Sequence, residues 1–189
     1  MSDTQRPELG REIATTSDGI DITRGFTGPL LTPYDSVLRT RGGNDLVIYE
    51  QVLSDAEVKA TLGQRQLAVT QCEWQVDAAS DKRIDKKAAE DLRQQLHAVG
   101  WDNITTKMRF GVFYGFAGAE LIYKPDGSRI VIDAIKVRNR RRFRFTPDGE
   151  LRLLTPTSMT EGEPATAPYF WNFQTGADND DEPYGLGLA

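Results

Sequence analysis

The chain has 189 residues, of which 28 are acidic and 23 are basic, so its formal net charge is −5. Hydrophobic residues make up 39% of the sequence and charged residues 27%, an ordinary globular composition that excludes a chain disordered throughout. One cysteine and one histidine exclude an internal disulfide and a zinc site built from four Cys and His ligands.

The sequence also lacks the usual signatures of catalysis and cofactor binding. The patterns GxGxxG, GxxxxGK[ST] and GxSxG are all missing. We therefore expect no catalytic residues, no cofactor and no metal, and a protein that is not an enzyme. The longest nearly apolar run, 110–123, is too short to cross a bilayer and contains Glu120, so no membrane span is expected. The polar N-terminus has no apolar core, so it is no secretory signal and a cytosolic compartment is expected.

Residues 1–45 differ in composition from the rest of the chain. They are rich in Thr, Ser, Asp, Gly and Pro, and their few apolar residues show no regular spacing. This composition predicts an extended or partly disordered N-terminal arm. The folded domain is expected in residues 46–189.

The first predicted element of that domain is a helix over about 55–71. Ser54, followed three residues later by Glu57, is typical of a capping box. Its apolar face would consist of Val58, Leu62 and Val69. Cys72–Ala78 then alternates apolar and polar residues and predicts a half-buried strand, in which Cys72 would be buried and inert.

Two further helices are predicted. Apolar residues recur every three or four positions from Ile84 to Val99, and Gly100 stands where a left-handed cap would end the helix. The same spacing continues after Asp102 as far as Phe116 and predicts a third, more buried helix.

From residue 117 the pattern becomes typical of strands. The expected strands are 117–124, 129–137, 140–146 and 150–154, with a possible fifth in 168–175. Pro-Asp-Gly at 125–127 and again at 147–149 predicts two hairpin turns. The polar run 155–168 is interpreted as a flexible loop. Helices followed by antiparallel strands predict an α+β fold in which N-terminal helices pack on an antiparallel sheet.

The most unusual stretch is VRNRRRFRF, residues 137–145. On a strand, side chains alternate between faces, so this stretch would place four arginines on one face: Arg138, Arg140, Arg142 and Arg144. Such a stripe has three interpretations: the solvent-exposed face of a sheet, a phosphate-binding surface, or a surface that contacts an acidic neighbouring subunit. The net charge of −5 does not favour general affinity for nucleic acid.

Four stretches are informative when they are taken together. They are LSDAEVKATLGQRQLAVTQCEWQVDA, MRFGVFYGFAGAELIY, IKVRNRRRFRFTPDGELRL and DDEPYGLGLA. In this order and at this spacing they resemble the Mu-type bacteriophage portal proteins. Each motif alone is weak, and it is their ordered combination that is specific. The resemblance runs from about Leu46 to the C-terminus.

The resemblance implies a structural protein of the virion, assembled in the cytoplasm of the bacterial host. Such proteins form a ring, typically dodecameric, at one capsid vertex. Terminase drives DNA through this ring, and the capsid and the head–tail connector proteins attach to it. The arginine stripe then gains two candidate partners, an acidic patch of the adjacent subunit or the passing DNA, and we favour the subunit.

The resemblance also implies that the chain comprises the outer, wing-like portion of a portal subunit. In the family, the segment similar to EPYGLGLA leads into the stem helix, and this chain ends at Ala189, on that threshold. We therefore expect that the chain alone does not package DNA. The alternative is a stand-alone nucleic-acid-binding module that uses the arginine strand, with Phe143, Phe145 and Trp171 as stacking surfaces.

Overall fold

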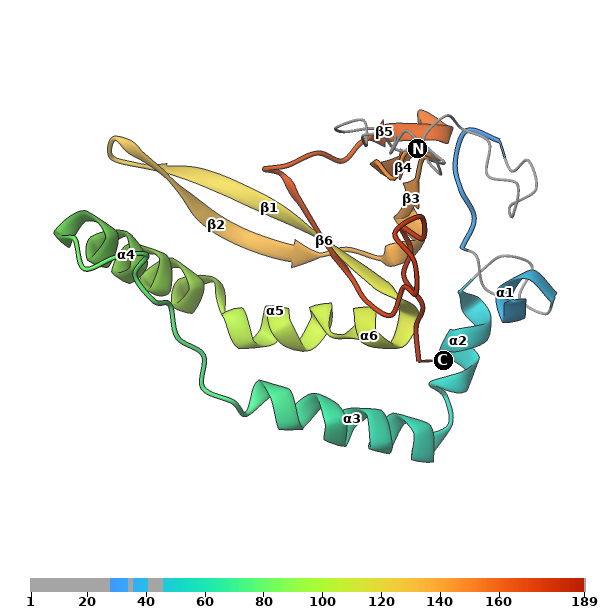
Figure 1. Cartoon of the computed structure of the whole chain (residues 1–189). Helices are drawn as coiled ribbons and strands as arrows, with labels where there is room; N and C mark the ends of the chain where they lie inside the picture. Colours follow the sequence, from blue (N-terminus) through green and yellow to red (C-terminus); the bar gives the residue numbers. More distant parts are fainter. Residues whose placement is uncertain (1–27, 34–35, 41–45, 189) are drawn as a thin grey trace, which may run out of the picture.

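The computed structural model describes residues 28–33, 36–40 and 46–188, so most of the predicted N-terminal arm lies outside the described residues. The described helices are α1 (Ser36–Thr40), α2 (Val47–Val52), α3 (Ala56–Thr70), α4 (Arg83–Val99), α5 (Trp101–Met108) and α6 (Phe110–Tyr114). The strands are β1 (Phe116–Asp126), β2 (Arg129–Val137), β3 (Phe143–Phe145), β4 (Leu151–Thr155), β5 (Ser158–Pro164) and β6 (Phe170–Gln174), with a short 3-10 helix η1 (Arg140–Arg142) before β3. Helices thus precede antiparallel strands, and the predicted α+β class is confirmed (Figure 1).

Helix α3 lies where the sequence predicts it, but its N-terminal cap is a different residue. The Asp55 carboxylate accepts hydrogen bonds from the backbone N–H groups of Glu57 and Val58 at 2.9 and 3.0 Å. Ser54 instead donates its hydroxyl to the carbonyl of Gln51 at 2.6 Å. Asp is as good a cap as Ser, and a carboxylate is additionally favoured by the positive end of the helix dipole. The capping-box assignment of Ser54 is therefore wrong by one residue.

Helix α4 ends at Gly100 as predicted, with the glycine in the left-handed conformation at φ 73°. Its predicted apolar face is only partly covered, because Ile84 and Leu92 remain exposed. The helix meets the β1–β2 hairpin through polar contacts instead. Gln95 accepts from the backbone N–H of Ile132 at 3.0 Å, and Asp91 pairs with a hairpin arginine at 2.7 Å.

The predicted strand at Cys72–Ala78 is not formed. Residues 73–78 are extended but belong to neither sheet, and Cys72 is exposed rather than buried. A strand requires a partner as well as the right periodicity. The segment links α3 to α4 along the side of the molecule away from the sheets (Figure 1), and none of the described strands pairs with it.

The predicted third helix is divided into α5 and α6, and it stops before Phe116. Gly115 has a φ of 94°, which ends α6 and turns the chain into β1. A Cβ atom at this position would lie 2.7 Å from the carbonyl oxygen of Tyr184, so the site favours glycine on steric grounds as well. The predicted burial of Ile104 and Met108 is confirmed.

The strands form two antiparallel sheets, with the orders β2-β1-β6 and β3-β4-β5. Both Pro-Asp-Gly turns close hairpins as predicted. Asp126 pairs with Arg129 in the first, and the N–H of Gly149 donates to the carbonyl of Thr146 at 2.9 Å in the second. The β6 strand confirms the fifth predicted strand.

Strand β5 corrects the interpretation of run 155–168 as a flexible loop. It pairs with β4 through Thr155 opposite Ser158 and Leu153 opposite Glu163. Its sequence, SMTEGEP, is polar and contains Gly and Pro, both of which are depleted in strands. Pairing with β4 outweighs this weak local preference.

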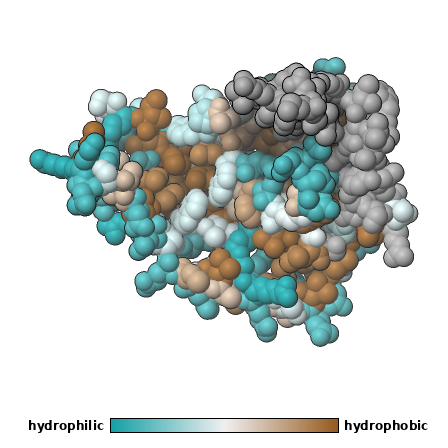
Figure 2. Space-filling model, in the orientation of Figure 1, coloured by the Kyte–Doolittle hydropathy of each residue, from teal (hydrophilic) through white to brown (hydrophobic). Residues whose placement is uncertain are grey.

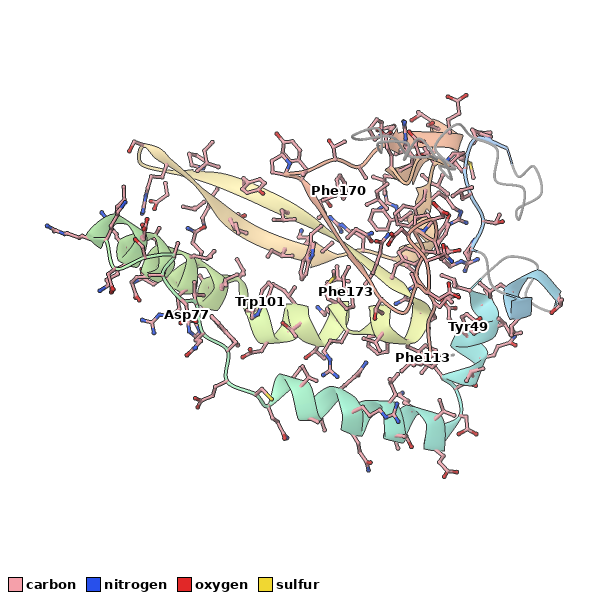
Figure 3. The ribbon with its side chains drawn as sticks, viewed as in Figure 1. Tyr49, Asp77, Trp101, Phe113, Phe170 and Phe173 are labelled. Carbon is pink, nitrogen blue, oxygen red and sulfur yellow. The ribbon has the colours of Figure 1, made fainter. Side chains whose placement is uncertain are left out.

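Two hydrophobic cores hold the fold together. The larger one joins α2, α6 and β3, and its members include Tyr49, Phe113, Phe116, Phe143 and Phe145. The smaller one lies between α5 and the long sheet and contains Ile104, Met108, Ala117 and Ala119. Figure 3 shows Tyr49 and Phe113 facing each other at one end and Trp101 and Phe173 nearer the middle.

The helices α4, α5 and α6 lie along one face of the β1–β2 hairpin, and α3 lies beyond α5 and α6 (Figure 1). On the face shown in Figure 2, hydrophobic atoms gather along the middle of the molecule and hydrophilic atoms over the α4 end. Within the ranges described, no helix is both long and apolar enough to span a membrane.

Candidate interface site

The arginine-rich stretch does not form one strand, so the predicted four-arginine face is not formed. Residues 140–142 turn as the 3-10 helix η1, and β3 comprises only Phe143–Phe145. Asn139 starts the turn, because its side-chain oxygen accepts the N–H of Arg141 at 3.0 Å. The turn carries the chain from the first sheet to the second and delivers Phe143 and Phe145 to the core, where they are 0% and 1% exposed. Burial of two aromatic rings outweighs the continuation of β2.

Arg138 is neutralised within its own sheet. Its guanidinium contacts the Glu120 carboxylate of neighbouring strand β1 through Nε at 2.7 Å and Nη2 at 2.5 Å. Both side chains are about one-third exposed. This two-pronged geometry occupies much of the donor capacity of the guanidinium, so Arg138 is committed to its own sheet.

Arg140 is committed to packing. Its guanidinium carbon lies 3.5 Å from the centroid of the Tyr114 ring, which is a cation–π contact. Burial lowers the pKa of the Arg140 guanidinium and raises the pKa of the Tyr114 phenol. Its Nε is buried and has no hydrogen-bond partner among the described residues. Arg140 therefore connects η1 to α6.

Unlike Arg138 and Arg140, Arg142 and Arg144 have guanidinium groups that contact neither a carboxylate nor an aromatic ring among the described residues. Arg142 is exposed, and its guanidinium makes no hydrogen bond or ion pair with the part of the chain that the structure describes; only its backbone N–H is bonded, to the carbonyl of Asn139 at 3.1 Å. Arg144 is half-buried, and it donates Nη1 to the carbonyls of Arg141 and Phe143 at 3.0 and 2.8 Å. The charge of Arg144 is thus oriented by the backbone but meets no carboxylate there.

A further arginine, Arg152 on β4, lies directly opposite Arg144 in the antiparallel register. Phe143 and Leu153 on the flanking pair point to the core, so the two arginines share the outer face of the sheet. Arg152 pairs with exposed Glu150 at 2.9 Å, while its Nε is buried and unpartnered in the described residues. We call Arg142, Arg144 and Arg152 the basic patch.

Sequence reasoning missed Arg152, although a signal for it was present. The Pro-Asp-Gly turn at 147–149 is nearly symmetric between the two predicted strands, and a hairpin turn fixes the register of its strands. Counting outward from the turn places position 144 opposite position 152. Like charges directly opposite each other destabilise a sheet unless an anion or solvent lies against them.

The aromatic residues of the alternative, nucleic-acid-binding hypothesis are not available as stacking surfaces. Phe143 and Phe145 are buried in the core. Trp171 is stacked on Trp101, with ring centroids 5.7 Å apart and planes inclined by 13°. This arrangement removes the base-stacking part of that hypothesis, because a stacking platform must expose its ring faces.

Within the described residues, no group of three or more His, Cys, Asp or Glu side chains is arranged to hold a metal ion. His97 is exposed and packs its ring 4.7 Å from that of Trp74, which is a structural contact. The basic patch is therefore the feature of the described surface with the clearest capacity for recognition, and its chemistry suits carboxylates or phosphates.

Comparison with known proteins gives a family for the chain. Residues 46–189 match the sequence model of the family described as "Portal protein of Mu bacteriophage". The matched range covers more than half of the chain. No individual curated protein matches the sequence.

Proposed function

Because the chain belongs to the family of Mu bacteriophage portal proteins, we propose that it is a structural subunit of the ring at the capsid vertex through which phage DNA is packaged and ejected. The observation that carries this proposal is the family match over residues 46–189. The protein then resides in the virion, with the bacterial cytoplasm as the place of assembly. The ring, dodecameric by analogy with the family, meets the terminase, the capsid and the head–tail connector proteins.

Within this function, residues 46–189 form the wing-like domain and residues 1–45 an arm, whose described part is not free of the domain, because Leu31 and Leu38 are packed into the larger core. The basic patch contacts an acidic surface of the adjacent subunit. A closed ring is built from heterologous contacts, in which one patch of each subunit meets a different patch of the next. Arginine suits this role because its planar guanidinium binds carboxylates in a two-pronged geometry and is more weakly hydrated than lysine.

The division of the arginines supports this choice of residues. Arg138 is bound to Glu120 and Arg140 to Tyr114, so neither has much capacity left for a partner. The guanidinium of Arg142 has no partner in the described chain, and that of Arg144 bonds there only to backbone carbonyls. A subunit contact fits better than DNA, because a conduit that gripped phosphates tightly would hinder the movement of the duplex.

The proposal is tested by replacing the two exposed or half-buried arginines of η1 and β3. Arg142→Ser and Arg144→Ser together should reduce the mass of the assembled protein at a given concentration, measured by light scattering after size-exclusion chromatography. Lys107→Ser is the matched control, because it removes an exposed charge from α5, away from the patch. Equal masses for the wild type and the arginine variant would reject the basic patch as a subunit contact.

A further inference from the structure

We infer that the extended segment Glu73–Ala78, here called the acceptor segment, is the surface that receives the basic patch of a second copy of this chain. The inference rests on the proposed function, since the ring supplies the second copy. It adds the identity of the receiving surface, which the family match does not give.

The backbone of the acceptor segment is the first argument. In the described part of the chain, none of the N–H or C=O groups of residues 73–78 makes a hydrogen bond. The segment nevertheless has the alternating pattern of a strand, with Glu73, Gln75 and Asp77 exposed and Trp74, Val76 and Ala78 half-buried. A continuous row of free carbonyls on an extended chain is an array of hydrogen-bond acceptors.

The acceptor segment is held in this shape by an anchor. The indole N–H of Trp74 donates to the carboxylate of Asp102 on α5 at 2.9 Å. The same ring lies 4.7 Å from the ring of His97 on α4. Contacts with two helices fix the start of the segment, so less conformational entropy is lost there when a partner binds.

The surroundings of the acceptor segment leave room for a partner. A groove of about 380 Å³ separates residues 75–78 from α4 and is lined on the helix by Lys86, Ala89, Glu90 and Arg93. Glu90 is already bonded to Arg93 and Gln94 within α4. The carboxylates of Glu73 and Asp77 thus supply the negative charge of the segment itself.

The basic patch has unused hydrogen-bond donors, which complement the free acceptors of the acceptor segment. Each guanidinium carries five N–H donors and no acceptor. The guanidinium of Arg142 uses none of them within the described chain, and that of Arg144 bonds there only to backbone carbonyls, so neither charge meets a carboxylate. Donors in excess on one surface and acceptors in excess on the other, with opposite charge, are what charge-assisted hydrogen bonds between subunits require.

The two surfaces lie at different ends of the molecule, as a head-to-tail contact requires. Figure 1 shows β3–β5 at one end and the link between α3 and α4 at the other, and Figure 3 shows Asp77 on that link. The acidic run 178–181 is a weaker candidate for the receiving surface. It precedes Tyr184, whose ring packs 4.8 Å from that of Phe145, so it lies at the same end as the patch.

The chain carries its own reporter for this contact, because its single cysteine, Cys72, is exposed and adjoins Glu73. Arg142→Cys places a thiol in the basic patch and leaves Arg144 and Arg152 to maintain the contact. Disulfides form only when the two Cα atoms come within about 7 Å. Under mild oxidation we expect a bond between Cys72 of one copy and position 142 of the next, and products longer than dimers, since every copy carries both thiols.

Two controls accompany this experiment. Cys72→Ser combined with Arg142→Cys should abolish the long products, and Lys107→Cys, on α5, should not form them. Peptide mapping by mass spectrometry identifies the linked pair. Charge reversal gives an independent readout: Arg142→Glu or Glu73→Arg alone should weaken association by about three- to fivefold, and the double variant should restore it.

The outcomes separate the inference from the function on which it rests. An oligomer without a 72–142 link, or with only symmetric 72–72 or 142–142 dimers, overturns the acceptor segment and leaves the ring proposal standing. A chain that stays monomeric at every concentration overturns both. Salt-sensitive binding to a short DNA duplex that is lost in Arg142→Glu, without self-association, would assign the basic patch to nucleic acid and overturn the inference.

Discussion

Replacement of Arg140 by alanine tests whether this arginine is held by packing within the chain or is free to bind a partner. The substitution removes the cation–π contact with Tyr114, made at 3.5 Å, and it removes part of the packing between η1 and α6. A cation–π contact at a partly buried site contributes about 1 to 2 kcal/mol. The two lost methylene groups contribute roughly 1 kcal/mol when half-buried. Against this stabilisation stands the Nε of Arg140, which is buried without a hydrogen-bond partner and costs the wild type about 1 kcal/mol.

The expected result is therefore a loss of about 1 to 2 kcal/mol in the free energy of unfolding for Arg140→Ala. For a chain of this length it corresponds to a fall in Tm of roughly 2 to 8 °C. Urea unfolding followed by tryptophan fluorescence measures the first quantity and calorimetry the second. Arg140→Met should recover the packing part, because it keeps an apolar chain of similar length.

The matched control is Arg142→Ala, which removes an exposed arginine two residues away. Its stability should lie within about 0.5 kcal/mol of the wild type. If Arg140→Ala were no more destabilising than Arg142→Ala, then Arg140 would not be a packing residue, and the division of the arginines into committed and free groups would be wrong.

Three other predictions concern packing, capping and pH. Gly118→Ala would place a Cβ atom 2.7 Å from the aromatic ring that covers it and should cost about 1 to 3 kcal/mol, whereas Gly63→Ala, with nothing within 4 Å, should gain up to about 1 kcal/mol. Opposite shifts in Tm check this pair, and equal shifts would contradict it. Asp55→Ala should lower the free energy of unfolding by about 1 kcal/mol, because it removes a helix cap, and Ser54→Ala should lower it clearly less. Chemical denaturation measures both values, and the reverse order would restore Ser54 as the cap. Burial raises the pKa of Tyr114 above its ordinary value of 10.0, so the unfolded chain loses this proton first. The contribution of Tyr114 to the free energy of unfolding is therefore fully present below pH 10 and is lost as the pH rises toward the folded-state pKa. A denaturation series in which wild type and Tyr114→Phe behave alike above pH 10 would refute this prediction.

Local chemistry made part of the fold predictable from sequence. The α4 helix ends at Gly100 because glycine adopts the left-handed conformation at little cost. The predicted strand 129–137 coincides with β2, since a Pro-Asp-Gly turn fixes where the hairpin reverses. In both cases a single residue type with a special backbone preference decides the outcome.

Tertiary partners decided the features that sequence reasoning missed. Residues 73–78 have the strand pattern without a partner, and β5 has a partner without the strand pattern. Pairing is a property of the whole chain, so periodicity alone assigns neither correctly. The arginine stripe failed for a related reason, because the burial of Phe143 and Phe145 in the second sheet requires a turn at 140–142.

The candidate site was thus half predictable. The stretch containing Arg142 and Arg144 stood out by composition, but which arginines are free depends on Glu120 and Tyr114, contacts that are distant in sequence. Arg152 could have been added from the hairpin register alone.

The most direct test of the central claim is the mass of the unmodified chain in solution. Light scattering should be recorded over a range of concentrations at low and high salt, with and without a short DNA duplex. A portal subunit whose basic patch meets a neighbouring copy should form oligomers larger than dimers without DNA, and salt should weaken them because the contact is charged. A chain that remains monomeric at low salt, whether or not DNA is present, would contradict the account.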